Sequence, residues 1–388
     1  MTPAADSARL RETVLPPPVP ARRVDFARPR VCLLGLPFDP IGLDDAVERI
    51  RDAAFAGRRC WVATPNLNFA IAARSDAAFR ASVLRSDLSL IDGMPLVWIA
   101  RLLGLPVPER VAGADLFEAL QAHRGPPLAV YLFGGPPGVA ARAAERINAR
   151  GGGVRCVGFD EAGYGPVESM SDAALIDRIN RSGAHFLIAA LGAQKGQSWI
   201  AHNASRLAPP VLCHLGAVMN FAAGTVRRAP RWAQRSGLEW AWRIKEEPAL
   251  WKRYARDGLH GARLVATRVL PAARAARAER RSADAQTPAV AIARTAAGTV
   301  LGPAAAAGDA AATALRVALG ECADSDAGVT IDLSGVGAVG NGFAAALLVA
   351  QGWFGDRGGF AITGAGPAAR ADLHRLLCDE LLSERIVP

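Results

Sequence analysis

Two short apolar runs near the N-terminal third of the chain each end in a cluster of polar residues. Residues 60–63 predict a buried strand that stops at Thr64-Pro65-Asn66, and residues 87–91 predict a second strand that stops at Asp92-Gly93. The segment 68–84 between them predicts a helix that joins the two strands. If the two strands are parallel neighbours, their polar ends share one edge of a sheet, where open α/β folds bind their ligands. This edge is the candidate active site.

The same alternation of apolar run and amphipathic segment continues through the first 225 residues. A strand from residue 30 leads into a helix that begins with Asp44 and Asp45, near the positive end of its dipole. Further apolar runs followed by turn residues lie at 128–133, 154–159, 186–191 and 211–215. This order predicts an α/β fold with a Rossmann-like parallel sheet covered on both faces over residues 30–225.

The remaining segments differ from this domain in composition. Residues 1–29 are rich in Pro, Ala and Arg and predict a disordered tail. Residues 226–269 predict a basic, tryptophan-rich helical appendage, which suits a membrane interface; the alternative is a solvated basic face with its tryptophans packed on the core. Residues 270–288 predict a linker, and residues 289–388 a small α/β module with a strand, a helix, a strand and a last helix.

Composition and charge limit the class of protein. The chain has 388 residues, 51% of them hydrophobic, and no apolar run long enough to span a bilayer or to serve as a signal peptide, so we expect a cytoplasmic location. Six scattered cysteines fit buried free thiols rather than disulfides or a metal site. The net charge of +9 is carried mostly by arginine, but no nucleic-acid-reading motif accompanies it.

Several blocks of sequence, in order, resemble the WecG/TagA/CpsF family of bacterial glycosyltransferases. The blocks are TPNLNFAIAARSD, DLSLIDGMPLVW, ERVAGADLFEAL, YLFGGPPGVAARAAERI, LGAQKGQSWI and GAVMNFAAGTVRRAPRWAQRSGLEWAWRI. The resemblance implies a Rossmann-like domain followed by a helical appendage. It also implies transfer of a sugar, often of the N-acetylmannosamine type or a hexose, from a UDP donor to a polyprenyl-diphosphate-linked acceptor in surface or exopolysaccharide synthesis. The implied reaction inverts the anomeric centre and uses no metal and no cofactor, since the UDP-sugar is a substrate.

The resemblance assigns roles to individual residues. Asp92 lies where the family places its proposed base, with Thr64 and Asn66 as groups that orient the substrate. From the residues alone, Asp92 could instead cap the next helix, and Thr-Pro-Asn could be only a turn. The donor-binding candidates are Gly134, Gly135, Gly192, Lys195, Gln197 and Asn220. The candidates for the acceptor and its lipid diphosphate are Arg110, Asp115, Arg243, Lys252 and Arg253.

The chain departs from the family pattern on the donor side. The usual loop begins Gly-x-Pro-Lys-Gln-Glu, but Gln194, Gly196 and Gln197 stand here in place of its proline, glutamine and glutamate. Asn220 stands where an aspartate is common. These changes leave open a second interpretation, a non-catalytic scaffold that senses UDP-sugar.

The C-terminal module resembles a STAS domain, the α/β fold of anti-sigma-factor antagonists. Many such domains have a phosphorylatable Ser or Thr where this chain has Gly340, Asn341 and Gly342, so we expect docking to a protein partner or oligomerisation rather than a phosphorylation switch. The expected partners are therefore a UDP-sugar, a lipid-linked glycan, the inner face of the cell membrane and a protein bound through the STAS-like module.

Overall fold

The computed structural model describes residues 18–163, 165–279, 290–295, 298–303 and 308–383. Its strands are β1 (Val31–Leu33), β2 (Leu36–Phe38), β3 (Cys60–Ala63), β4 (Leu88–Ser89), β5 (Leu128–Gly134), β6 (Val154–Asp160), β7 (Phe186–Ala190), β8 (Val211–His214), β9 (Val290–Thr295), β10 (Gly298–Pro303), β11 (Val329–Asp332) and β12 (Phe360–Thr363). The helices of the first domain are α1 (Leu43–Phe55), α2 (Leu67–Ala72), α3 (Ala77–Leu84), α4 (Met94–Leu103), α5 (Gly113–Ala122), α6 (Val139–Arg150), η1 (Glu168–Met170), α7 (Ala173–Arg181), α8 (Ala193–Asn203) and α9 (Gly216–Ala223). Those that follow are α10 (Arg231–Arg235), α11 (Glu239–Glu246), η2 (Pro248–Leu250), α12 (Trp251–Leu264), η3 (Val265–Val269), α13 (Leu270–Glu279), α14 (Asp309–Cys322), α15 (Asn341–Phe354), α16 (Pro367–Arg375) and α17 (Glu380–Ser383).

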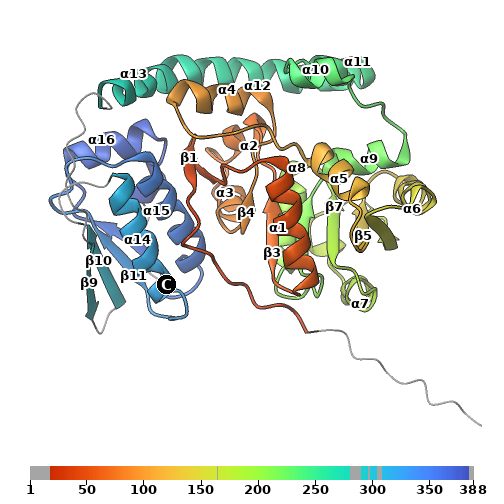
Figure 1. Ribbon diagram of the computed structural model, residues 1–388, viewed down its shortest axis with the longest axis horizontal. Helices are drawn as coiled ribbons and strands as arrows, with labels where there is room; N and C mark the ends of the chain where they lie inside the picture. The colour runs from red at the N-terminus through yellow and green to blue at the C-terminus, as the bar shows by residue number, and fades with distance from the viewer. Residues whose placement is uncertain (1–17, 164, 280–289, 296–297, 304–307, 384–388) are drawn as a thin grey trace, which may run out of the picture.

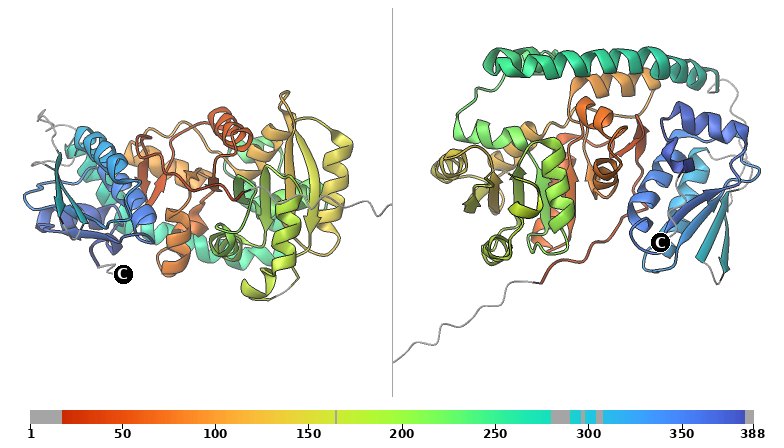
Figure 2. Two further views of the ribbon diagram at one scale, coloured as in Figure 1. Left: turned by 90° about the horizontal axis from the view of Figure 1, so that it is seen from below. Right: turned by 180° about the vertical axis from the view of Figure 1, so that it is seen from behind.

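A parallel sheet of six strands forms the centre of the first domain, in the order β4-β3-β8-β7-β5-β6. Apolar side chains of α1, α5, α6 and α9 join the core on one face of this sheet, and those of α7 and α8 join the core on the other (Figures 1 and 2). The strands β3 and β4 pair in parallel, with Val62 opposite Leu88. The predicted α/β class and the parallel neighbours that carry the candidate site are confirmed.

Two predicted elements have a different form. The apolar run from residue 30 is not one strand but the antiparallel hairpin β1–β2, which turns at Leu34 and Gly35 with φ angles of 54° and 77°. The segment 68–84 is not one helix, because Asp76 begins a new one: its carboxylate accepts a hydrogen bond from the Phe79 amide and caps α3. Local turn and cap residues thus interrupt apolar patterns that look continuous.

The appendage is helical as predicted, and its last helices continue past the expected end. The helices α12 and α13 run on through a π-helical turn, η3, so residues 270–279 are helix rather than linker. The sequence of α13, LPAARAARAE, is rich in strong helix formers, which accounts for this. Residues 280–288 lie outside the described residues. Figure 1 shows this helical run along one side of the molecule, above α2 and α4 and reaching over the C-terminal module.

The C-terminal module has a four-stranded sheet in the order β12-β11-β10-β9. Its predicted strands at 329–334 and 359–364 and its helices are present, whereas β9, β10 and α14 were not predicted. Every residue of α15 from Phe343 to Phe354 is buried. One hydrophobic core includes α15, the hairpin β1–β2 and α3, so the module shares a core with the first domain. Its assignment as a STAS domain stays a prediction.

Asn341, one of the three residues singled out at the start of α15, lies in this domain interface. Its side-chain amide accepts a hydrogen bond from the Cys32 amide (2.9 Å) and donates one to the Cys32 carbonyl (2.6 Å). Gln351 further along α15 accepts a buried hydrogen bond from Arg80 of α3. The helix face that begins at Asn341 is therefore already occupied by the same chain.

Residues 18–29, expected within the disordered tail, lie extended against the domain interface. Phe26 is buried and stacks on Phe354, with ring centroids 5.8 Å apart. Arg28 pairs with the buried carboxylate of Asp39. Residues 1–17 lie outside the described residues. All six cysteines are buried and free, as predicted.

Candidate active site

Thr64 and Asp92 meet at the predicted sheet edge, where the loops after β3 and β4 touch. The Asp92 amide donates a hydrogen bond to the Pro65 carbonyl (3.0 Å). The Asp92 carboxylate accepts one from the Gly113 amide (3.5 Å) at the start of α5. A methyl group at Gly113 would lie 3.7 Å from Thr64 Oγ1 and 2.6 Å from Leu215. Gly113 is therefore the point where both polar side chains converge, and a larger residue there would have to displace the Leu215 side chain.

Asp92 is not a helix cap. The following helix, α4, begins after Gly93, which has a φ of 120° that other residues rarely adopt, and no side chain caps it. Asn66, by contrast, does cap a helix: its side chain accepts a hydrogen bond from the Phe69 amide at the start of α2. Asn66 also lies beside Gly93. The structure thus keeps Asn66 at the edge but uses its oxygen for local structure.

The environment of Asp92 favours the protonated acid. Burial of the carboxyl raises the pKa of Asp92 from 3.8 to about 7, although the nearby Arg110 partly opposes this. The charges of Glu239 and Asp115 raise that pKa further. A half-buried carboxyl with a pKa near neutrality is suited to accept a proton during a reaction.

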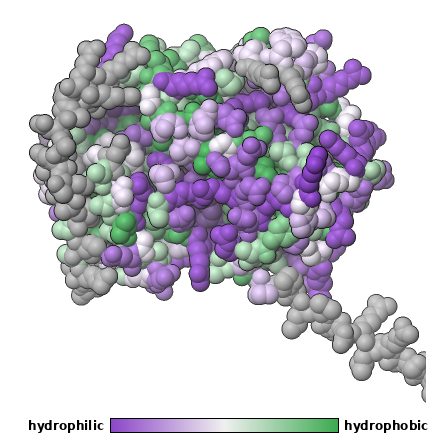
Figure 3. Space-filling view, in the orientation of Figure 1, coloured by the Kyte–Doolittle hydropathy of each residue, from purple (hydrophilic) through white to green (hydrophobic). Residues whose placement is uncertain are grey.

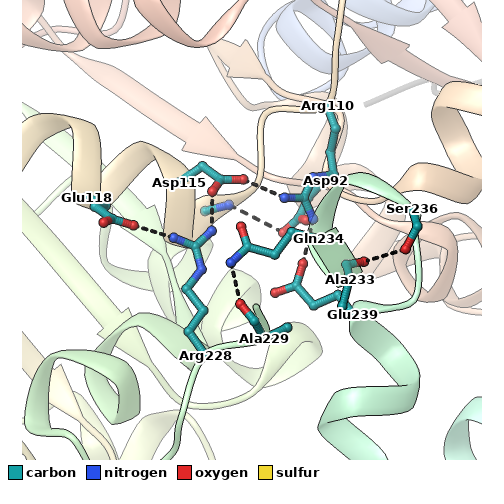
Figure 4. A network of polar contacts seen from close by, with 11 residues as sticks. Asp92, Arg110, Asp115, Glu118, Arg228, Ala229, Ala233, Gln234, Ser236 and Glu239 are labelled. Atoms are coloured by element: carbon teal, nitrogen blue, oxygen red, sulfur yellow. Dashed lines mark hydrogen bonds and ion pairs between the residues drawn. The ribbon is translucent and has the colours of Figure 1, made fainter. Parts of the chain in front are cut away.

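Arg110 and Asp115 belong to a network of ion pairs next to Asp92 (Figure 4). Arg110 donates to Asp115 (2.7 Å) and to Glu239 (2.5 Å). Arg228 pairs with Asp115 and with Glu118. Because Arg228 and Glu239 follow the first domain, the network fastens the appendage over the candidate site.

Arg228, Glu118 and Glu239 were not among the predicted site residues. Glu239 carried a signal, because it is the only acidic residue between positions 226 and 245. This isolation singles out Glu239, but nothing in the segment identifies Arg110 as its partner.

The donor-side candidates lie at the carboxyl ends of β5, β7 and β8. Gly134, Gly135 and Gly192 all have positive φ angles, and Asn220 is half-buried in α9. Lys195 is exposed and donates to the Gly165 carbonyl (2.9 Å). Gln197 lies on the buried face of α8, where its Oε1 accepts a hydrogen bond from the Trp61 indole (3.2 Å). Gln197 therefore faces the core, while the other candidates remain at the sheet edge.

The start of α6 is already occupied by a carboxylate. The Gly138 amide donates to Glu161 (2.6 Å), and the Gly135 amide donates to the Ala190 carbonyl (2.9 Å). The amides that the Gly134-Gly135 turn was expected to offer to an anion are thus partly used within the chain.

Arg243, Lys252 and Arg253 do not join the network at Asp92. Arg243 of α11 pairs with Glu247, the residue that follows this helix. Lys252 and Arg253 are exposed beside the rings of Trp251 and Tyr254. Around them, large apolar side chains also reach the surface: Trp232, Leu238, Trp240, Trp251, Leu259 and Leu270. Figure 3 shows apolar patches along this upper edge of the molecule. Trp232, Trp240 and Trp251 are exposed, so for these three the alternative in which the tryptophans pack on the core is wrong; Trp242 is half-buried.

Comparison with known proteins identifies the family. The model of the WecG/TagA/CpsF glycosyltransferase family matches residues 31–275. This chain belongs to that family. Over 195 residues it is 30% identical to the N-acetylglucosaminyldiphosphoundecaprenol N-acetyl-beta-D-mannosaminyltransferase of Bacillus spizizenii, a match that covers 50% of this chain and 74% of the relative. The family match spans the first domain and the appendage through most of α13, and it places Asp92, Arg110 and Glu239 inside one glycosyltransferase unit.

A search for membrane-spanning segments gives a negative result for the described residues. None of their helices combines the length and the apolar character that crossing a bilayer requires.

Proposed function

We propose that this glycosyltransferase moves a sugar from a UDP donor to a polyprenyl-diphosphate-linked acceptor, with inversion at the anomeric carbon and without a metal ion. The Bacillus relative is named for transfer of N-acetylmannosamine to a lipid diphosphate that carries N-acetylglucosamine, which supports this class of acceptor. The observation that carries the proposal is Asp92, a carboxyl with a pKa of about 7 at the ligand-binding edge of the sheet.

In the proposed reaction Asp92 is the base. The ionised carboxylate takes the proton of the acceptor hydroxyl as the hydroxyl oxygen attacks the anomeric carbon of the donor. The bond from that carbon to the diphosphate breaks on the opposite face, and its electrons leave with UDP. Thr64 orients the substrate by hydrogen bonding, since its hydroxyl does not compete for the proton. Asn66 contributes its remaining amide donor.

The appendage is proposed to bring the site to its lipid substrate at the inner face of the cell membrane. Exposed indoles favour the headgroup level, and the nearby cations attract anionic lipid. Lys252 and Arg253 are exposed on α12 beside Trp251, so they are available to the lipid diphosphate. Arg243 requires release from Glu247 before it can take the same role.

The base assignment is tested with Asp92→Asn. Sugar transfer to a short-chain lipid acceptor is measured by mass spectrometry over a panel of UDP-sugars. We expect the rate of transfer to fall at least about a thousandfold while the affinity for UDP stays nearly unchanged. Asp76→Asn is the matched control, because that carboxylate only caps α3. Full activity in Asp92→Asn would disprove the mechanism. UDP binding by the unaltered chain without any transfer would support the sensing scaffold instead.

The membrane role is tested by sedimentation with anionic vesicles. A full-length chain carrying Trp240→Ser, Trp251→Ser and Leu259→Ser is expected to stay in the supernatant. Phe55→Ser and Val317→Ser are matched controls, since they remove exposed apolar side chains elsewhere. If the triple variant sediments as the unaltered chain does, the appendage is not the membrane-binding surface.

A further inference from the structure

His214, the last residue of β8, was not among the predicted site residues. Its ring packs under the first turn of α8, and a methyl group added at Gly196 would overlap with it. The side chain is about nine-tenths buried. The ring therefore fills the space that a side chain at position 196 would otherwise occupy.

The Nε2 atom of His214 is buried and has no hydrogen-bond partner within the described residues. It lies close to Gly216, where a methyl group would be 3.1 Å from Nε2 and 4.0 Å from the Gly192 amide nitrogen. Burial lowers the pKa of His214 to about 4, so the ring is neutral in the absence of a ligand. An unpartnered buried nitrogen is unfavourable for folding alone, which points to a partner that comes from outside the chain.

The surroundings of Nε2 are suited to an anion. The helices α8 and α9 begin at the carboxyl ends of the adjacent parallel strands β7 and β8, with no side-chain cap on either helix. Amide groups of a first helical turn and the helix dipole both favour a phosphate. The space beside Gly216, where α9 starts, is thus bordered both by Nε2 and by the amide of Gly192, the residue that precedes α8.

We propose that His214 binds the diphosphate of the sugar nucleotide through Nε2, at the starts of α8 and α9. This inference rests on the proposed function. With its proton on Nε2, the ring donates a hydrogen bond to an oxygen of the leaving diphosphate, which gains negative charge as the bond to the sugar breaks. The acceptor proton still goes to Asp92, so His214 acts on the donor and Asp92 on the acceptor.

The test compares UDP binding and stability in His214→Leu and His214→Gln of the full chain. His214→Leu is expected to weaken UDP binding in calorimetry by about tenfold or more while the melting temperature stays equal or rises, because an unpartnered buried nitrogen is removed. His214→Gln, which keeps a hydrogen-bond donor at this position, is expected to retain part of the affinity. His202→Leu, at the other end of α8, is the matched control and keeps normal binding.

Nitrogen-15 NMR of the unaltered chain provides a second measurement that does not depend on the variants. UDP is expected to shift the His214 Nε2 resonance, and uridine, which lacks the diphosphate, is not. Unchanged UDP affinity in His214→Leu, or a resonance that UDP leaves in place, would overturn the role of His214 while leaving the transferase proposal intact. An unaltered chain that neither binds UDP nor transfers sugar would overturn the proposed function itself.

Discussion

Asp92→Asn is predicted to make the protein more stable while it removes activity. The folded state favours the protonated Asp92, because its pKa is about 7 against an ordinary 3.8. Below pH 3.8 the carboxyl is protonated in both states and the raised pKa has no cost. As the pH rises, the unfolded chain releases the proton first, so the cost to the folded state grows until Asp92 itself ionises near pH 7.

The size of this effect follows from the difference between the two pKa values. Linkage gives a cost of about 2 kcal/mol at pH 5 and about 4 kcal/mol at pH 8, as upper limits for a half-buried group. Asparagine has nearly the same shape and no charge to desolvate. The gain in the free energy of unfolding of Asp92→Asn should therefore increase between these two pH values and level off above neutrality.

Urea denaturation at the two pH values measures this gain directly. Asp39→Asn is the matched control, because Asp39 is also a buried aspartate but is paired with Arg28 and Arg30 and accepts from the Ser89 amide. Removing its charge leaves two buried guanidinium groups without their anion, so we expect a loss of about 3 kcal/mol. The raised pKa would be refuted if Asp92→Asn were less stable than the unaltered chain at pH 8. It would also be refuted if the substitution changed the free energy of unfolding by the same amount at both pH values.

Three other predictions concern the pH dependence of activity, the charge of Glu239 and the domain interface. The value of kcat/KM should rise with pH to a plateau through an apparent pKa of about 7, because only ionised Asp92 is a base; a flat profile from pH 5 to 9 would contradict this. Glu239→Gln should move that limb to lower pH, since the Glu239 charge raises the pKa of Asp92, whereas Glu118→Gln, which loses only a partner of Arg228, should move it less. Gly352→Ala should lower the free energy of unfolding by about 2 kcal/mol, because its methyl group would overlap with the Leu84 carbonyl across the domain interface; Gly320→Ala in α14, which meets nothing, should not, and equal melting temperatures for the two would refute the tight interface.

The residues that sequence could place at the site are those fixed by short-range pattern. Thr64 and Asp92 each follow an apolar run directly, and parallel pairing of β3 and β4 is enough to bring them together. Glu239 lies 129 positions from its partner Arg110, and nothing in either segment specifies the pair. His214 ends an apolar run as many strand residues do. Its packing against Gly196 of α8 becomes visible only in the folded structure.

The fold shows the same division between local and distant information. The helix α15 is apolar nearly all round, which predicts a buried helix, but the pattern cannot say that its second apolar face meets β1, β2 and α3. The hairpin β1–β2 and the break before α3 depend on one turn and one cap inside apolar runs. Such boundaries are set by single residues, whereas the class of the fold is set by the whole alternation.

The shared core explains how the molecule tolerates a costly active site. Above neutral pH the charge on Asp92 costs up to about 4 kcal/mol, which is comparable to removing one large side chain from a protein core. His214 adds a buried nitrogen without a partner. Both groups lie at the carboxyl edge of the sheet, where a substrate can supply the missing partner. The continuous apolar cluster that joins α15 to the first domain extends as far as Ile91, next to Asp92, so its packing helps to offset both costs.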